Sequence, residues 1–153
     1  MNFSKRYFVK VFALGTIFIL SNFKYLFAAT KKMINQNLSE EQKDIMFNEG
    51  TERAFTSSLL NEKRKGTYHC ANCGNLLFNS TAKYDSGTGW PSFSEAVPGA
   101  FNTKIDYTFG VKRIEYHCAK CGAHHGHVFA DGPEKTGKRF CNNGLCLIFK
   151  PSE

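Results

Sequence analysis

The 153-residue sequence predicts a single, mainly β domain preceded by short helices. Glycine, phenylalanine and tyrosine, with 13, 15 and 6 copies, favour strands and turns. From residue 66 onward, short apolar runs are separated by glycine, asparagine, aspartate and proline, which is typical of a β-rich body. Apolar residues make up 42% of the chain and charged residues 22%, so the composition is that of a globular protein.

The first 30 residues are excluded from this domain because they have the order of a secretory signal. Three basic residues among the first ten precede an apolar run at 11–20, and the segment ends in small residues at Ala28 and Ala29. A signal peptide cleaved near these alanines is therefore expected. The run is short for a membrane span and Lys24 interrupts its extension, so an uncleaved amino-terminal anchor is the alternative.

This leader implies an exported protein, whether periplasmic, luminal or secreted, or one that its uncleaved leader anchors in a membrane. In both cases the leader contacts a membrane. Residues 31–36 then form a linker and residues 37–153 form the domain. We expect that domain to be a monomer.

The net charge of +7 does not indicate nucleic-acid binding. Six of the twenty basic residues precede Met33, and no acidic residue precedes Glu40. The other fourteen basic residues face thirteen acidic ones, so the domain is close to neutral. A surface that follows a phosphate backbone is not expected, and nucleic acid is excluded as a partner.

The segment after the linker predicts a helix that begins at Ser39. Its hydroxyl can cap the free amides while Gln42, three residues later, reaches back to the cap. The apolar pairs at 45–46 and 54–55 give a helical face that is interrupted at Gly50. Strands are predicted at the apolar runs 76–78, 107–111, 113–117 and 145–149.

Two copies of a Cys-x-x-Cys-Gly motif predict one structural zinc ion. Two cysteines three apart in a tight turn can bind one ion, and the glycine lets backbone amides point at the thiolates. Two such turns complete a closed tetrahedral shell, with Cys70, Cys73, Cys118 and Cys121 as ligands. A pair of disulfides and a rubredoxin-type iron centre are the alternatives.

The remaining cysteines are Cys141 and Cys146. Cys141 follows Lys138 and Arg139, whose positive charges favour the thiolate and so lower the pKa of the thiol. Three histidines within 124–127 can carry protons near neutral pH. Residue types alone leave a buried apolar cysteine and a polar or metal-binding histidine loop as equal alternatives.

Several blocks of the sequence resemble the signature blocks of the type B methionine sulfoxide reductases. These blocks lie at 83–93, 118–129, 131–133 and 136–143, and their order and spacing agree over roughly residues 37–151. Both zinc motifs fall where that family has them. Several unrelated blocks in register are far more specific than any single motif.

The resemblance implies two antiparallel sheets in a barrel-like sandwich after short helices, with the zinc away from the active cysteine. It implies an oxidoreductase that repairs proteins under oxidative stress by reducing the R epimer of methionine sulfoxide, peptide-bound in preference to free. The expected course is thiolate attack on the sulfoxide sulfur, a sulfenic acid intermediate, and regeneration by a thioredoxin-like or small thiol.

The same resemblance assigns roles to individual residues. Cys141 would be the nucleophile, and Arg139 would hold it as the thiolate. Trp90 would offer its ring face to the methyl group of the substrate, where composition alone favours a plain core aromatic. His124 and His127 would bind or protonate the sulfoxide oxygen.

Asn143 would add a hydrogen bond to the sulfoxide oxygen, although residue type alone favours a turn residue. His125 receives no role because the family commonly has an apolar residue there. Thr88 stands where the family has its usual resolving cysteine, and a hydroxyl cannot form a disulfide. Cys146 is a candidate resolving cysteine, with direct attack by an external thiol as the alternative. Gly144 replaces the more usual serine.

Two other functions remain open at this point. The first is a zinc-ribbon binding module for protein or nucleic acid, which would not need Cys141; the near-neutral charge after the leader disfavours nucleic acid. The second is a general disulfide oxidoreductase that uses the Cys-x-x-Cys pairs.

Overall fold

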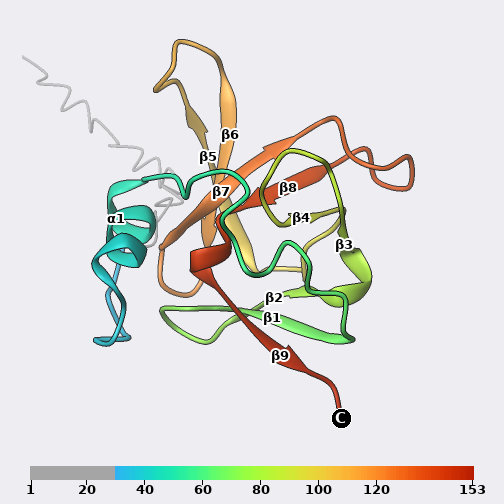
Figure 1. Ribbon diagram of the computed structural model, residues 1–153. Coiled ribbons are helices and arrows are strands. Elements are labelled where there is room, and N and C mark those ends of the chain that lie inside the picture. Colours follow the sequence, from blue (N-terminus) through green and yellow to red (C-terminus); the bar gives the residue numbers. More distant parts are fainter. Residues whose placement is uncertain (1–29) are drawn as a thin grey trace, which may run out of the picture.

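The computed structural model describes residues 30–153, which form two antiparallel sheets and one α-helix (Figure 1). The smaller sheet has the order β2-β1-β9, and the larger has the order β3-β4-β8-β7-β6-β5. The predicted leader lies outside the described residues, except for Thr30. The mainly β fold with two antiparallel sheets is confirmed. No helix within residues 30–153 has the length and apolar character needed to cross a membrane.

The elements follow one another in a fixed order along the chain. They are α1 (Glu40–Asn48), β1 (Gly66–Cys70), β2 (Leu76–Asn79), the 3-10 helix η1 (Ser80–Ala82), β3 (Lys83–Tyr84), β4 (Ser92–Phe93), β5 (Phe101–Asp106), β6 (Arg113–Cys118), β7 (His124–Phe129), β8 (Arg139–Asn142), the 3-10 helix η2 (Gly144–Cys146) and β9 (Leu147–Pro151).

Helix α1 begins where the sequence predicts. The Ser39 hydroxyl accepts from the backbone N–H of Gln42 at 3.1 Å, and the Gln42 side chain accepts from the Ser39 N–H at 3.0 Å. The helix ends earlier than its expected apolar face, because Glu49 adopts a left-handed cap with φ 63°. The expectation of a second apolar pair in a helix is therefore wrong: Phe55 lies in a loop and is 72% exposed.

Two of the predicted strands also differ from the structure. Residues 107–111 form the turn between β5 and β6, because Gly110 adopts a φ of 72° and its N–H closes the turn onto the Tyr107 carbonyl. In the run 145–149, the first two residues belong to η2, so Cys146 precedes the strand β9.

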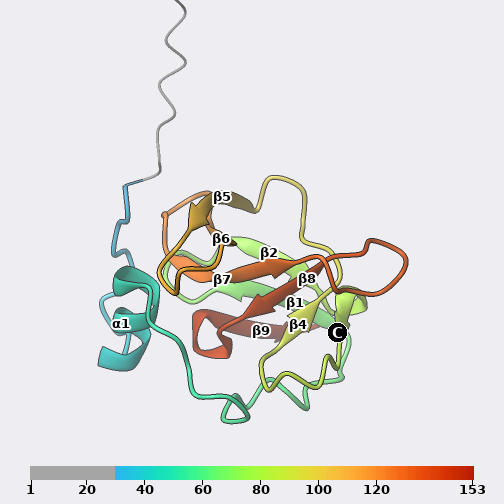
Figure 2. The same cartoon turned by 90° about the horizontal axis from the view of Figure 1, so that it is seen from above.

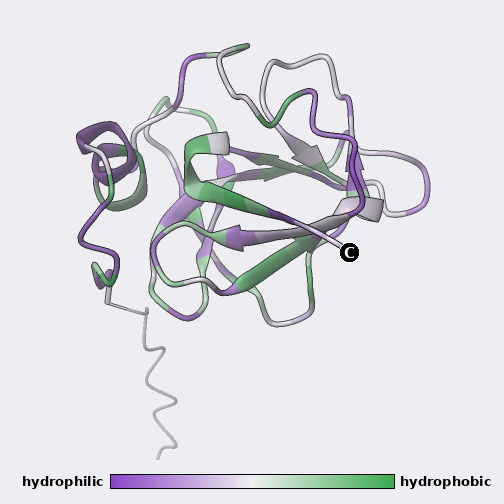
Figure 3. Ribbon diagram, turned by 60° about the horizontal axis from the view of Figure 1, so that its bottom comes forward, coloured by the Kyte–Doolittle hydropathy of each residue, from purple (hydrophilic) through white to green (hydrophobic). Residues whose placement is uncertain are grey.

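The two sheets lie one over the other (Figure 2), and the core between them contains many aromatic rings. Phe78 of β2 stacks on Phe93 of β4, with ring centroids 4.0 Å apart and an interplanar angle of 7°. Tyr68 of β1 and Tyr116 of β6 pack edge-on against Phe93 and Phe78 respectively. Colouring by hydropathy shows apolar and polar residues mixed along the strands, while α1 is mostly polar (Figure 3). The aromatic contacts of Phe78 and Tyr68 join the smaller sheet to the core-facing side of the larger one.

Candidate active site

Cys141 lies in the middle of the larger sheet, in register with residues of its neighbours. It pairs with His127 of β7 on one side and with Ser92 of β4 on the other, and His127 in turn pairs with Glu115 of β6. Paired residues of an antiparallel ladder project from the same face. The side chains of Cys141, His127 and Glu115 therefore share the face of the sheet opposite the core.

A pocket of about 230 Å³ opens on this face. It is lined by Thr51, Trp90, Arg113, His124, Gly126, His127, Phe129, Cys141, Asn142 and Asn143. Five of the six residues that the resemblance assigns to the reaction line it. Arg139 is the exception, and Cys146 and the four predicted zinc ligands are also absent from the lining.

A β-bulge brings both histidines to the pocket. His124 and His127 are three residues apart, so strict alternation along a strand would place them on opposite faces. The β6–β7 register shifts between Tyr116, which pairs with Gly126, and His117, which pairs with His124. His125 is left without a partner strand residue, and the shift turns His124 back to the pocket face.

The bulge sends His125 into the core instead. Its ring is fully buried and packs edge-on against Phe101, with centroids 5.6 Å apart. Among the described residues, neither ring nitrogen makes a hydrogen bond of good geometry. Burial lowers the pKa of His125 to about 4, so the ring is neutral at physiological pH. This agrees with the absence of an assigned role.

Gly126 is required by the close approach of β7 to β8. A Cβ atom on this residue would lie 2.0 Å from the carbonyl oxygen of Cys141. Any larger side chain would push the two strands apart and separate His127 from Cys141.

Behind His124 lies a buried carboxylate that the sequence reasoning missed. Oε1 of Glu115, which is 1% exposed, is 2.9 Å from Nδ1 of His124, although the N–H is not aligned with that contact. Nζ of Lys104 lies 3.1 Å from Oε2. Burial alone would raise the pKa of Glu115, but the contacts with His124 and Lys104 bring it below its usual value. The Glu115 side chain is therefore a carboxylate at neutral pH. Since Nδ1 of His124 faces this carboxylate, Nε2 is the nitrogen that does not contact it.

His127 has a different carboxylate partner. Its Nε2 lies 2.8 Å from Oδ2 of Asp106, which also accepts from the Arg113 guanidinium at 2.5 Å. Burial lowers the pKa of His127, and the Asp106 carboxylate opposes this effect. Each histidine of the pocket is therefore oriented by its own acidic residue from β5 or β6.

Arg139 affects Cys141 less than the sequence predicts. Its guanidinium donates two hydrogen bonds to Asp131, at 2.9 and 2.8 Å, and stacks over Phe129 at 4.4 Å. Burial raises the pKa of Cys141 above its ordinary value, and Arg139 and the Thr88 hydroxyl only partly offset this. The expectation of a lowered thiol pKa is wrong for the free pocket, because the loss of hydration outweighs a cation that is already paired.

Trp90 and Asn143 are held by one residue that the sequence reasoning also missed. The Trp90 indole N–H donates to the Glu52 carbonyl at 2.8 Å, and the Asn143 side-chain oxygen accepts from the Glu52 N–H at 2.9 Å. The buried Glu52 carboxylate accepts from the N–H groups of Gly144 and Leu145. No sequence pattern marks Glu52, since its partners are about 40 and 90 residues away.

The structure explains why glycine rather than serine stands at position 144. A Cβ atom at this position would lie 1.8 Å from the Ser57 hydroxyl and 2.8 Å from its Cβ. Ser57 thus occupies the space that a side chain at 144 would need.

Cys146, the candidate resolving cysteine, is fully buried in η2. Burial raises the pKa of its thiol well above the ordinary value. Both Cys141 and Cys146 are free thiols in the described part of the chain, so the role of Cys146 as the resolving cysteine stays a prediction.

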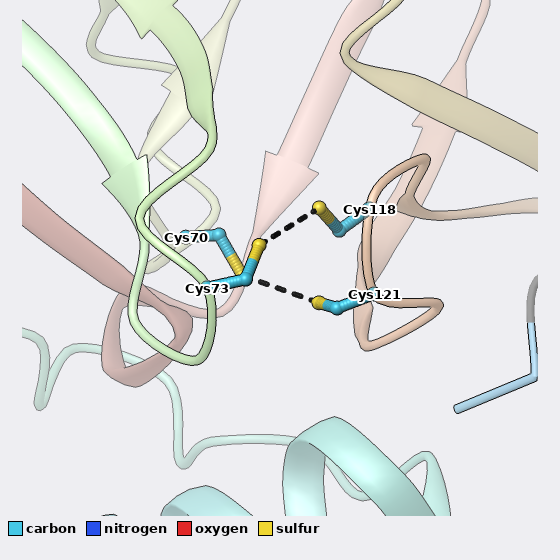
Figure 4. A group of neighbouring side chains, drawn as sticks. All are labelled: Cys70, Cys73, Cys118 and Cys121. Atoms are coloured by element: carbon cyan, nitrogen blue, oxygen red, sulfur yellow. Dashed lines mark hydrogen bonds between the residues drawn. The ribbon is translucent and has the colours of Figure 1, made fainter. Parts of the chain in front are cut away.

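The four cysteines of the repeated motif lie together on two facing turns (Figure 4). Their sulfurs are all within 4.8 Å of one another, with Cys70 and Cys121 3.8 Å apart and Cys73 and Cys118 3.6 Å apart. Sulfurs bound at about 2.3 Å to a tetrahedral zinc lie about 3.8 Å from one another, whereas a disulfide needs about 2.05 Å. The predicted single structural zinc site is confirmed, and the disulfide alternative does not fit.

Comparison with known proteins places this architecture in a family. Residues 38–151 match the SelR domain. The peptide methionine sulfoxide reductase MsrB of Agrobacterium fabrum is 49% identical over 117 residues, which cover 76% of this chain and 87% of that protein. MsrB of Thiobacillus denitrificans is 50% identical, with 76% and 89% covered, and MsrB of Escherichia coli K12 is 50% identical over 121 residues, with 78% and 88% covered.

The pocket, the four-cysteine site and the match over most of the chain all lead to one assignment. The chain belongs to the SelR domain family, alongside the MsrB peptide methionine sulfoxide reductases.

Proposed function

We propose that the protein reduces the R epimer of methionine sulfoxide in oxidised proteins, with Cys141 as the nucleophile. The observation that carries this proposal is the single pocket that Cys141, two histidines and Trp90 line together, in a chain about half identical to MsrB enzymes.

The chemistry requires a nucleophile and an acid at the same sulfoxide. The sulfur of Cys141 attacks the sulfoxide sulfur, and the oxygen is protonated as its bond to that sulfur breaks. The water so formed then attacks the Cys141 sulfur and breaks the new S–S bond, so that methionine is released and Cys141 is left as a sulfenic acid. The methionine sulfur gains two electrons and Cys141 loses two.

We assign the proton to His124 and the binding of the oxygen to His127. The ionised Glu115 faces Nδ1 of His124, which leaves Nε2 as the nitrogen that can donate into the pocket. Asp106 fixes the His127 ring through Nε2. Glu115 and Asp106 are positioning residues, because they act through the histidines.

The thiolate of Cys141 forms against the effect of burial. Arg139 and Thr88 favour the ionised sulfur, and a neighbouring imidazole can accept its proton when the sulfoxide enters. Trp90 presents its ring to the methyl group of the substrate, while Asn143, whose amide is bound to backbone groups of Glu52 and His125, shapes the adjoining wall.

An external thiol is the reductant that this pocket favours. Cys146 is buried, and Thr88 supplies no thiol, so a thioredoxin-like or small thiol would attack the sulfenic acid directly. Two thiols restore Cys141 and leave as a disulfide with one water. Mass spectrometry after sulfoxide treatment tests this route, because a Cys141–Cys146 disulfide would instead support internal resolution.

The basic and apolar leader supports export or membrane anchoring of this activity. A reductase in such a compartment would repair surface methionines that oxidants reach first. Detection of a mature chain that begins after Ala29 would support a cleaved signal.

The decisive experiment measures turnover of both sulfoxide epimers by the wild type and by Cys141→Ser. We expect turnover of the R form only, and its abolition by the substitution. Equal zinc content and equal circular dichroism of the two proteins would exclude a folding defect. Undiminished activity of the variant would overturn the proposal.

A further inference from the structure

The hairpin between β5 and β6 ends in a cluster of exposed apolar side chains, called here the hairpin tip. Its members are Ile105 (55% exposed), Tyr107 (63%), Phe109 (75%), Val111 (66%) and Ile114 (43%). The hairpin projects from the body of the protein (Figure 1). A soluble domain rarely gathers so many exposed apolar side chains in one place without a use for them.

The tip does not need these side chains to fold. Asp106 holds the turn by accepting from the Thr108 N–H at 2.8 Å, and Gly110 donates to the Tyr107 carbonyl at 2.8 Å. The Arg113 guanidinium closes the strand ends through Asp106. Polar and backbone groups therefore fix the turn, and the apolar side chains remain free for contacts with another molecule.

The same turn forms part of the pocket wall. Arg113 lines the pocket and also lies over the Phe109 ring, 4.7 Å from its centroid. Asp106, the neighbour of Tyr107, binds His127 at 2.8 Å. The Phe109 side of the tip therefore adjoins the pocket and is linked to it through Arg113 and Asp106. Ile105 and Ile114 alternate with Asp106 and Glu115 and lie on the other face of the hairpin.

We propose that the hairpin tip binds apolar side chains next to the methionine sulfoxide in an unfolded polypeptide. The inference rests on the proposed function and names its substrate class. Methionine is mostly buried among apolar residues in folded proteins, so an oxidised segment that has lost its packing offers such neighbours. A free amino acid offers none.

The expected effect is on substrate binding, since the tip touches none of the reacting atoms. Contacts made equally in the ground state and the transition state change KM and leave kcat alone. The enzyme should therefore prefer an apolar-flanked peptide sulfoxide to a serine-flanked one, and both to N-acetylmethionine sulfoxide.

The test compares these three R-sulfoxide substrates with the wild type and with a Tyr107→Ser/Phe109→Ser double variant, which keeps Asp106 and Arg113. The ratio of kcat/KM for the apolar-flanked peptide to that for N-acetylmethionine sulfoxide should fall about tenfold, through KM. Val111→Ser, at a side chain with no role in the turn, should lower the same ratio by a smaller factor. Ile148→Ser is the matched control, because Ile148 is 45% exposed but lies on β9.

The possible results separate the two proposals. An unchanged ratio in both tip variants would overturn the peptide-binding role. An equal loss with all three substrates would also overturn it, because the tip would then act only by holding Asp106 and His127. If the wild type reduces none of the three sulfoxides, the proposed function itself fails.

Discussion

In the zinc site, each pair of cysteines sits on a turn that closes in the same way. Gly74 donates to the Cys70 carbonyl and Gly122 donates to the Cys118 carbonyl, both at 2.8 Å, with φ of 70° and 71° at the two glycines. In the pocket, by contrast, Cys141 is one residue of a strand, and its partners reach it only through sheet pairing and distant loops.

The difference teaches where each site is vulnerable. A zinc turn is complete within five residues, so the metal and two such turns suffice to build the site. The pocket depends on a bulge in β7, a close contact at Gly126 and two buried carboxylates. Losing the zinc should therefore remove the fold, whereas damage to the pocket should remove activity from a protein that stays folded.

Zinc removal should have the largest effect on stability. Its binding free energy, on the order of 10 kcal/mol, is comparable with the whole stability of a small domain. We expect a strong chelator, or Cys118→Ser, to abolish the cooperative thermal transition and the β signal in circular dichroism. Cys141→Ser is the matched cysteine control and should melt as the wild type does. A metal-free protein with an unchanged Tm would contradict the comparison.

Glu115→Gln should separate activity from stability on the pocket side. Removing the carboxylate charge that faces Nδ1 of His124 should misplace the proton donor and lower kcat/KM about 100-fold. Glu95→Gln, at a half-exposed surface pair with Lys135, is the control. A loss of activity together with an equal loss of thermal stability would leave Glu115 a merely structural role.

Features that local geometry fixes could be predicted from the sequence. The Ser39 capping box and the zinc ligands depend on residues three apart, and both agree with the structure. The run 107–111 has the composition of a strand but forms a turn, because Gly110 and the Asp106 hydrogen bonds to Thr108 decide the backbone there. Such hydrogen bonds cannot be predicted from residue composition.

The pocket could be predicted only through family resemblance. Alternation would separate His124 from His127, and nothing local signals the bulge that reunites them. Glu115 reaches the pocket because β6 pairs with β7 and sets it opposite His127. Glu52 reaches it because its loop binds Asn143. The lowered pKa expected for Cys141 failed for a related reason, since the sequence showed Arg139 but neither its pairing with Asp131 nor the burial of the thiol.

His125→Leu tests the core side of the bulge. The folded-state pKa of His125 is about 4, below the ordinary 6.5, so the unfolded chain binds a proton that the folded one does not. Stability should therefore fall as pH drops from about 6.5 to about 4, by about 2–3 kcal/mol from this group. Urea unfolding should show that the leucine variant loses less stability than the wild type over this range and is equal or more stable at pH 7.5. Parallel losses in both proteins would place the acid sensitivity elsewhere.

The smallest effect concerns the contact between Gly144 and Ser57, beneath the pocket. Gly144→Ser should destabilise the protein by about 1–3 kcal/mol, because the new Cβ would meet the Ser57 hydroxyl at 1.8 Å. Combining it with Ser57→Gly should recover about 1 kcal/mol or more beyond additivity in a double-mutant cycle. Because the Gly144 N–H is bound by Glu52, which also holds Trp90, the single variant should lose activity as well. If the two free-energy changes simply add, the side chains at 144 and 57 do not compete for the same space. The backbone beneath the pocket would then accommodate a new side chain more easily than the zinc-binding turns.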